Sequence, residues 1–493
     1  MPAWLTAFLA RLVRLPAARR GAVAVFVGAA VVPLVAGIGV SVDAGRGYLV
    51  KSRLGQALDA AALAGGRQVF SPTRDADIRM FFQANFPTGY MQATVTGPTI
   101  NVDANGETIT VGASALVPTT FMKVIGFNEM TVSSTTVVKR ANRGMELMLV
   151  MDNTGSMSGS KITAMKAAAT DLVNILYGNR ETIPNFWVGL VPYVATVNIG
   201  NTRTSWLALG TYNPANYSPG VWKGCVEARN SPYEEAQAET LPSVVPWRPT
   251  LWASNSGVTY LDGRGRVVPG DNQWPPIVET SAAGNNATGP NIGCGPPITP
   301  LQPNKSTAIS AIAGMAAWSR GGTMGNLGLA WAWRSLSPAW RGMWGSPSPA
   351  NLPLDYDQPL MDKVVVMLTD GNNEWYDYPG YAPGCAGIAT PCLFPDADYT
   401  AYGRLAEGRL GTTNAATATT TINNRMSSLC TAMKAKNITI YAIVLQENNA
   451  ATQTLYRNCA SKPEYFFVSP TAAELSAIFR EIATQLSNLR LAQ

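Results

Sequence analysis

The chain has 493 residues, of which 46% are hydrophobic and 14% are charged, and its formal net charge is +6. This length is too great for one hydrophobic core, so we expect two or three domains, and the composition excludes a disordered protein. Four of the positive charges are arginines 11, 14, 19 and 20, just before an apolar run, so the charge gives no argument for nucleic acid as a partner. The chain contains no histidine, which excludes Ser-His-Asp and Cys-His mechanisms.

Residues 21–42 form an uncharged apolar run about as long as the roughly 20 residues that span a bilayer. Arginines precede the run and Asp43 follows it, which orients the N-terminus towards the cytoplasm. A cleaved signal peptide is the alternative, but the run is too long and no small-x-small cleavage site follows at once. We therefore predict a basic cytoplasmic segment (1–20), one transmembrane helix (21–42) and a periplasmic or otherwise extracytoplasmic remainder.

Three short motifs surround this predicted helix. They are Arg-Arg-Gly-Ala-Val-Ala-Val-Phe (19–26), Asp-Ala-Gly-Arg-Gly-Tyr (43–48) and Gln-Ala-Leu-Asp-Ala-Ala-Ala-Leu-Ala (56–64). Together they resemble the N-terminal segment of TadE/TadG-type proteins of the Flp (Tad) pilus assembly machinery. The resemblance implies a bacterial inner-membrane protein whose partners are pilus or secretion components. Pilin-like subunits carry a glutamate five residues after their processing glycine, and Phe26 at that distance from Gly21 favours an anchored TadG-like member over a fibre subunit.

After the membrane run, the alanine-rich stretch predicts that the helix continues as a solvated helix, and residues 43–140 read as that helix plus a small α+β module. Residues 75–85 predict a short helix, and Asn105-Gly106 between two alternating runs is a strong hairpin signal. A short helix at 118–126 and a strand at 130–138 complete the module. It contains no chemical constellation, so we expect a spacer or packing platform that ends near residue 141.

The strongest functional signal lies in the second half of the chain. Residues 147–151 predict a strand buried on both faces, which ends in Asp152 and is followed by a polar loop with Thr154 and Ser156 and by an amphipathic helix. In open α/β sheets the ligand site lies beyond the carboxyl ends of the strands. Alternate residues of an extended loop point the same way, so three oxygens can converge, and hard oxygens suit Mg²⁺. Thr323, after two glycines, and Asp370, at the end of a second buried strand, could complete the site.

The order Asp-x-Thr-x-Ser, Gly-Gly-Thr, Thr-Asp-Gly resembles the metal-ion-dependent adhesion site of the von Willebrand factor type A (vWA) domain. The resemblance implies that Thr154 and Ser156 bind Mg²⁺, or another divalent cation such as Mn²⁺ or Ca²⁺, directly. It also implies that Thr323 does so in one state, and that Asp152 and Asp370 act largely through water. The alternative is that these are ordinary residues of βα turns and helix N-caps.

Residues 145–493 therefore predict a doubly wound α/β (Rossmann-like) vWA domain, with an N-terminal transmembrane helix and a small α+β module ahead of it. Its buried strands lie near 147–151, 186–191, 364–368, 438–444 and 465–468, in alternation with helices that include 472–489. A long insertion at about 201–305 is rich in Pro, Gly and Trp, and we expect it to be ordered and near the metal face. A smaller insertion spans about 373–410.

Six cysteines in an extracytoplasmic chain indicate a disulfide framework, for which fifteen connectivities are possible. We favour Cys225–Cys294, Cys385–Cys392 and Cys430–Cys459. A zinc site is the alternative, but the chain has neither Cys-x-x-Cys spacing nor histidine.

These features predict a non-enzymatic, membrane-anchored, metal-dependent protein-binding module that serves Flp/Tad-type pilus assembly or adhesion, with a partner carboxylate at the open metal position. One alternative is a structural envelope protein whose metal is capped internally by Glu234, Glu235 or Glu239. The other is a phosphohydrolase, because residues 152–156 resemble the aspartyl-phosphate motif of haloacid-dehalogenase-like proteins, although Asn153 replaces the motif lysine.

Overall fold

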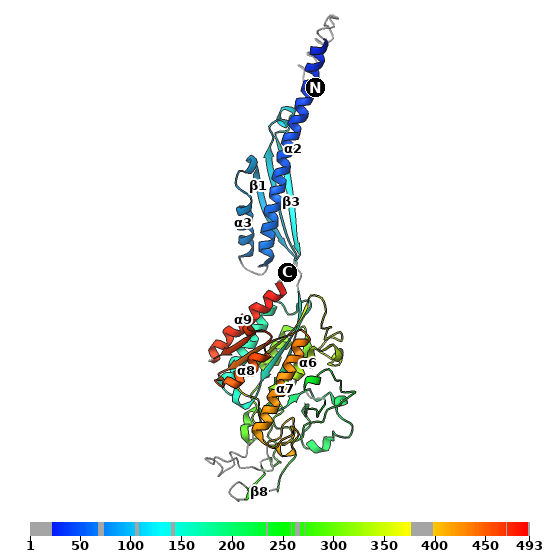
Figure 1. The fold of residues 1–493 in the computed structure, drawn as a ribbon, viewed down its shortest axis with the longest axis vertical. Helices are drawn as coiled ribbons and strands as arrows, with labels where there is room; N and C mark the ends of the chain where they lie inside the picture. The colour runs from blue at the N-terminus through cyan, green and yellow to red at the C-terminus, as the bar shows by residue number, and fades with distance from the viewer. Residues whose placement is uncertain are drawn as a thin grey trace. The chain divides into compact units, whose positions relative to one another are not determined.

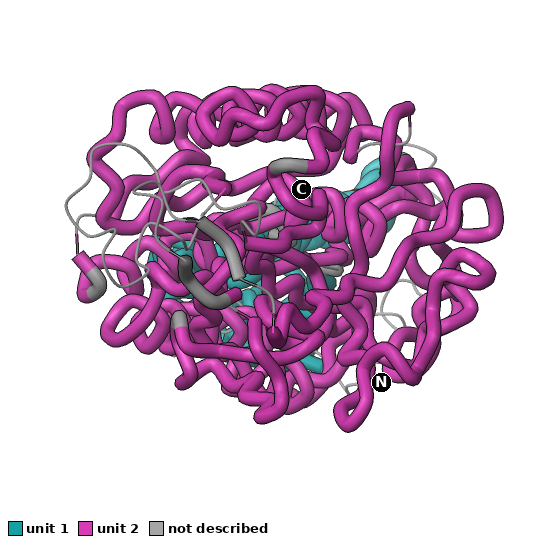
Figure 2. The backbone as a smooth tube through the Cα atoms, turned by 90° about the horizontal axis from the view of Figure 1, so that it is seen from below, with its two compact units in different colours: residues 1–142, 493 teal, residues 143–492 magenta. Residues whose placement is uncertain are grey.

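The computed structural model describes residues 22–67, 73–103, 108–139, 143–232, 235–257, 259–261, 267–270, 272–375, 398–469 and 471–491. The chain forms two compact units, residues 1–142 with 493 and residues 143–492 (Figure 2). The predicted basic segment 1–20, the Asn105-Gly106 turn and Cys385–Cys392 lie outside the described residues.

A single helix, α2 (Ala22–Arg67), dominates the first unit and continues through Pro33 for 46 residues. Its N-terminal half exposes apolar side chains such as Phe26 and Val32, and it is the one helix among the described residues that is long and apolar enough to cross a membrane. The expectation of a solvated second half is wrong. Leu54 and Leu58 recur there at helical spacing and are fully buried, because that stripe packs against the rest of the unit.

The predicted helix near 75–85 and the predicted strands are present in the first unit, whereas the helix expected at 118–126 is only a short 3₁₀ turn at 122–125. Helix α3 (Arg74–Asn85) packs on α2, and three antiparallel strands follow in the order β1-β2-β3: β1 (Thr94–Val102), β2 (Thr108–Pro118) and β3 (Glu129–Lys139). The sheet lies along α2 (Figure 1). Strand β2 alternates between buried and half-buried residues, so one face of the sheet meets the helices. Short 3₁₀ turns, η1 (Tyr90–Gln92) and η2 (Met122–Ile125), lie in the connections.

The second unit contains a six-stranded sheet whose chain-order numbering reads 3-2-1-4-5-6 across the sheet, a doubly wound order. Its strands, from one edge to the other, are β10 (Thr299–Gln302), β5 (Phe186–Tyr193), β4 (Gly144–Asp152), β12 (Met361–Thr369), β14 (Ile438–Leu445) and β15 (Phe466–Ser469). All pair in parallel except β10, which is antiparallel. The five predicted strands are confirmed.

Strand β10 was not predicted, because residues 299–302 fell inside the expected insertion. It has only four residues and contains Pro300, so it carries no apolar run of the kind that predicts a buried strand. Proline is tolerated there because β10 is an edge strand.

Helices cover both faces of this sheet, as Figure 1 shows. In β4, Leu147 and Leu149 belong to one core and Met148 and Val150 to the other, which explains the unbroken apolar run. The first core includes residues of α4 (Ser160–Tyr177), α5 (Lys305–Ala313) and α9 (Ala472–Leu491). The second includes residues of α6 (Gly325–Leu336), α7 (Ala415–Ala435) and α8 (Ala450–Cys459).

The long insertion is ordered in its described residues and packs on α6. Trp206 and Trp247 contact Trp331 of α6, with ring centroids 6.4 and 4.9 Å away, and Trp340 and Trp344 complete the aromatic cluster. Its short elements are β6 (Val197–Asn198), β7 (Cys225–Val226), β8 (Thr259–Leu261), β9 (Val267–Pro269), η4 (Thr204–Trp206), η5 (Pro214–Tyr217), η6 (Glu235–Gln237) and η7 (Ser281–Asn286).

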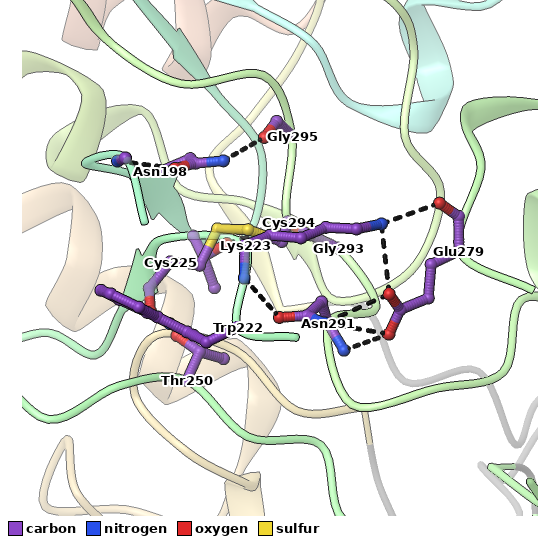
Figure 3. The surroundings of a disulfide bond; sticks show 12 residues. Asn198, Trp222, Lys223, Cys225, Thr250, Glu279, Asn291, Gly293, Cys294 and Gly295 are labelled. Atoms are coloured by element: carbon purple, nitrogen blue, oxygen red, sulfur yellow. Dashed lines mark hydrogen bonds and ion pairs between the residues drawn. A yellow bond between two sulfur atoms is a disulfide. The ribbon is translucent and has the colours of Figure 1, made fainter. Parts of the chain in front are cut away.

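Two disulfides match the favoured pairings. Cys225–Cys294 closes the insertion, and beside it Lys223 forms an ion pair of 3.1 Å with Glu279, which also accepts a hydrogen bond from Asn291 (Figure 3). Cys430–Cys459 joins α7 to α8.

Candidate metal centre

Two aspartates from neighbouring parallel strands meet at the carboxyl edge of the sheet. Asp152 is the last residue of β4 and Asp370 directly follows β12, and Met151 and Leu368 are partners in the register of these strands. Two hydroxyls link the carboxylates. Thr154 Oγ1 lies 2.6 Å from Asp152 Oδ1 and 3.0 Å from Ser156 Oγ, which donates to Asp370 Oδ1 at 2.7 Å. Four of the five predicted residues therefore form one continuous hydrogen-bonded chain.

The loop that carries the hydroxyls was expected to be extended, but it is not. Thr154 has an extended backbone, but Gly155–Met157 form the 3₁₀ turn η3. It is this turn, and not strand-like alternation, that brings the two hydroxyls together. Position 155 is tightly packed, because a Cβ there would lie 2.9 Å from Ser319 Oγ and 3.2 Å from Ser319 Cα.

Thr323 reaches the same place by a separate backbone pairing. The short strand β11 (Gly322–Thr323) pairs with β13 (Glu374–Trp375), so that Thr323 is opposite Glu374, four residues after Asp370. Thr323, Thr154 and Ser156 line one open cavity of about 300 Å³. Within the described residues no hydrogen bond joins the Thr323 side chain to the other four predicted ligands.

A buried ion pair fixes the turn before Thr323. Arg320, Gly321 and Gly322 have φ angles of 82°, 87° and 101°, a run that a chain of ordinary residues would resist. Asp398 holds this turn, because it pairs with the Arg320 guanidinium at 2.8 Å and accepts the Gly321 N–H at 2.8 Å. The guanidinium also lies 4.5 Å from the ring centre of Trp252, so the insertion contacts one wall of the cavity, as predicted.

Asp152 is a buried carboxylate held by neutral hydrogen-bond donors. It is fully buried and accepts hydrogen bonds from the Thr154 N–H (2.8 Å), Thr369 Oγ1 (2.9 Å) and the Tyr193 hydroxyl (3.3 Å). In the part of the chain that the structure describes, no lysine or arginine forms an ion pair with it. Burial and, second to it, the charge of Asp370 raise the pKa of Asp152 from 3.8 to about 6.

Lys161, in the first turn of α4, is not among the predicted site residues. Its ammonium lies 2.7 Å from Asp370 Oδ2. A lysine in the first turn opposes the helix dipole, and this misplaced charge is the signal that could have identified it. Sequence reasoning also missed Tyr193, Thr369 and Glu374, which line or support the site.

The donor set fits a hard divalent cation. Two carboxylates and three hydroxyls supply only oxygen, which suits Mg²⁺, Mn²⁺ or Ca²⁺. Among the described residues no three His, Cys, Asp or Glu side chains form a metal cluster, so the nitrogen- and sulfur-rich sites typical of zinc have no counterpart there. A cation beside Asp152 would balance its buried charge.

Two of the three predicted internal caps, Glu235 and Glu239, lie elsewhere. Glu235 pairs with Arg425 at 3.6 Å and accepts from the Tyr402 hydroxyl. Glu239 accepts from Tyr356 and pairs with Lys436, and Glu234 lies outside the described residues. The carboxylate that does line the cavity is Glu374, whose pKa is raised by burial.

Asn153 stabilises the loop and does not contribute a ligand to the site. Its side chain donates to the Met151 carbonyl at 2.9 Å and accepts the Ala316 N–H at 3.1 Å, which ties the loop to the segment before Thr323. It therefore does not face the cavity as a phosphate-binding lysine would.

Comparison with known proteins bears on the N-terminal segment and the fold. Residues 21–68 match the family described as putative Flp pilus-assembly TadE/G-like. No curated protein matches the sequence.

Several solved structures are similar at low identity. The pilus adhesin SpaC from Lactobacillus rhamnosus GG is 10% identical over 80% of this chain, with a TM-score of 0.33, and this chain covers 34% of SpaC. The vWF domain of the type V pili tip protein Mfa5 from Porphyromonas gingivalis is 12% identical over 70% of this chain and 96% of its own, with a TM-score of 0.34. Proximal thread matrix protein 1 from the mussel byssus, in a structure with a zinc-occupied MIDAS motif, is 12% identical over 71% of this chain and 47% of its own, with a TM-score of 0.29.

The chain thus begins with a segment similar to the TadE/G-like pilus-assembly family and continues into a doubly wound α/β unit with an oxygen-rich site at its carboxyl edge.

Proposed function

We propose that this chain is a membrane-anchored, metal-dependent protein-binding module that serves Flp/Tad-type pilus assembly or adhesion. Helix α2 would cross the bacterial inner membrane once, with the N-terminus in the cytoplasm and the rest of the chain outside it. The single observation that carries the binding role is the buried Asp152 carboxylate, which forms no ion pair with a lysine or arginine of the described residues and is linked through Thr154 and Ser156 to Asp370.

Thr154, Ser156, Asp152, Asp370 and Thr323 would hold Mg²⁺ or another divalent cation. Such a cation, when bound, offers an open position to a carboxylate oxygen of a partner protein. The open cavity beside Thr154 and Thr323 gives a partner side chain access to this position. Lys161 would then compensate part of the charge of Asp370 and leave Asp152 as the less neutralised ligand.

The test uses the full-length protein in lipid nanodiscs. Mg²⁺ affinity is measured by titration calorimetry, and capture of pili purified from the host that encodes the chain is measured with Mg²⁺ or with EDTA. We expect the wild type to bind Mg²⁺ and to capture pili only with the metal, and Asp152→Ala to do neither. Asp171→Asn is the matched control, because Asp171 is a half-buried carboxylate on α4 that pairs with the exposed Arg480. Equal capture under all conditions would refute metal-dependent binding.

A structural envelope protein with an internally capped metal is the second candidate, and Glu374 now supports it in place of the three glutamates first considered. Water relaxation by bound Mn²⁺ separates the two. An open site keeps exchangeable water on the ion, whereas a cap by Glu374 excludes it and Glu374→Gln restores it. We expect the wild type and Glu374→Gln to relax water equally, as an open site requires.

An enzymatic role is not proposed, because the phosphohydrolase motif needs a lysine at position 153. Asn153 stands there, and its side chain is hydrogen-bonded to backbone groups. Phosphate release from an acyl-phosphate or nucleotide panel, lost in Asp152→Asn, would overturn this.

A further inference from the structure

The loop that joins β2 to β3, residues 119–128 and here called the hairpin tip, exposes four large apolar side chains. The exposed fractions are 45% for Phe121, 86% for Val124, 56% for Ile125 and 58% for Phe127. Lys123 is the one charged residue of the tip. Four exposed large apolar side chains within seven consecutive residues indicate an interaction surface and not an ordinary solvated turn.

The hairpin tip lies against α2 where the apolar run 21–42 ends (Figure 1). A Cβ at Gly39 would lie 2.5 Å from the Phe121 Cβ, so the tip and the helix are in direct contact at this glycine. Gly39 is four residues before Asp43, the first charged residue after the run. At the helical rise of 1.5 Å per residue, Phe121 therefore contacts the helix about 6 Å from Asp43, towards the apolar run.

At least seven of the ten backbone N–H groups of the tip are hydrogen-bonded within the protein, which favours an apolar phase around it. The Asp43 carboxylate, 1% exposed, accepts the N–H groups of Thr120 (2.9 Å), Phe121 (2.8 Å) and Met122 (2.7 Å). The remaining partners are carbonyls of the tip itself, which accept the N–H groups of Thr119, Val124, Gly126 and Phe127. Asp43 thus binds the tip to the helix, and the three N–H groups stabilise its negative charge.

We propose that the hairpin tip inserts into the extracytoplasmic leaflet of the membrane that α2 crosses. Its apolar side chains lie among the outer parts of the acyl chains, and Lys123 extends its ammonium to the lipid phosphates. The distance of about 6 Å between that contact and Asp43 agrees with the roughly 5–10 Å at which interfacial segments are buried. The proposal rests on the membrane anchor proposed above and is independent of the metal centre. The tip is a second attachment of the first unit to the bilayer and restricts its rotation about α2.

The first experiment measures the depth of the tip in full-length protein. Val124→Cys carries an environment-sensitive nitrobenzoxadiazole dye, and the protein is reconstituted into phosphatidylcholine–phosphatidylglycerol vesicles that contain lipid with a doxyl quencher near the headgroup. Val137→Cys is the matched control, because Val137 is another exposed valine (53%) of the same unit. It lies nine residues after the tip, near the C-terminal end of β3. We expect several-fold stronger quenching at residue 124 than at residue 137.

Vesicle flotation separates failure of the anchor from failure of this inference. If the protein floats with the vesicles but both dyes are equally quenched, the anchor stands and the inserted tip is refuted. If the protein does not float, the anchor fails and the tip proposal falls with it.

A second experiment avoids new thiols beside the native disulfides. A benzophenone amino acid replaces Val124, and the illuminated protein is analysed by mass spectrometry. Adducts with phospholipid support the proposal, whereas adducts with a second protein chain, as a fibre contact would give, overturn it. Asp43→Asn should lower lipid adducts at residue 124 several-fold while α2 stays in the vesicle, because the tip loses its bond to the helix.

Discussion

The two compact units of this protein differ in how completely their apolar side chains are buried. In the first unit the sheet is covered on one face, and half of α2 and the hairpin tip leave large apolar side chains bare. In the second unit helices cover both faces of the sheet, and even charged groups are buried in pairs, such as Glu146 with Lys363 and Arg320 with Asp398.

This difference indicates two kinds of surroundings. With the proposed anchor, the first unit would place its bare apolar surface beside the lipid, whereas the second supplies its own core and gathers polar groups at one edge of its sheet. Four predictions test this contrast, in decreasing order of expected effect.

The largest effect is expected from the buried pair in the second unit. Glu146 and Lys363 are partners in the register of β4 and β12, and Glu146 is fully buried. Lys363→Met leaves a buried carboxylate without its partner, so the free energy of unfolding should fall by about 3–5 kcal/mol. Tryptophan fluorescence in urea reports this unit, since every tryptophan except Trp4 lies in residues 143–492. The double variant Glu146→Met/Lys363→Met should recover most of the loss, and no recovery would contradict the pairing.

The second prediction compares the two disulfides. Cys225→Ser/Cys294→Ser should lower the free energy of unfolding by about 2–4 kcal/mol, because the bond closes a long loop of 69 residues. Cys430→Ser/Cys459→Ser opens a loop of 29 residues and should cost about 0.8 kcal/mol less on the same chain-entropy argument. Urea unfolding of both variants checks the order. A reversed order would show that the insertion draws its stability from packing on α6 instead.

The third prediction concerns the effect of the buried Asp152 charge on the stability of the metal-free protein. Because the pKa of Asp152 is raised from 3.8 to about 6, the folded protein holds its proton to higher pH than the unfolded chain does. In EDTA, proton binding to Asp152 therefore stabilises the folded protein at low pH, and this stabilisation is lost as the pH rises from about 4 to about 6. At pH 7 Asp152→Asn should stabilise the metal-free protein by about 1–2 kcal/mol and abolish the rise in Tm that Mg²⁺ gives to the wild type. Asp171→Asn should change neither quantity, and stabilisation of Asp152→Asn by Mg²⁺ would contradict the site.

The smallest effect is expected in the hairpin tip. Asp43→Ala removes the acceptor of three backbone N–H groups, so hydrogen exchange at Thr120, Phe121 and Met122 should accelerate about tenfold, equivalent to about 1.4 kcal/mol. Asp59→Ala is the control, since Asp59 accepts one exposed hydrogen bond from Thr136. Unchanged exchange at the three amides would show that Asp43 does not hold the tip.

Elements with a strong period or an unbroken apolar run were predictable from the sequence. The five parallel strands are confirmed: four of the runs are buried almost throughout, and the short edge strand β15 is half-buried. The edge strand β10 was missed, since four residues with a proline have no period, and the second half of α2 was wrongly expected to be solvated. The site shows the same division. The motif order identified Asp152, Thr154, Ser156, Thr323 and Asp370 as candidates, but nothing local in the sequence pointed to Asp398 or Glu374.

The sequence by itself determined the apolar helix, the alternation of strands and helices, and the residue types at the carboxyl edge, because these depend on hydrophobic pattern and local turn chemistry. Only the tertiary structure decided that Lys161 meets Asp370, that Asp398 holds the Arg320 turn, and that Asp43 binds the hairpin tip. These contacts join residues 77 to 209 positions apart. They arise from sheet order and loop closure, which no local pattern records.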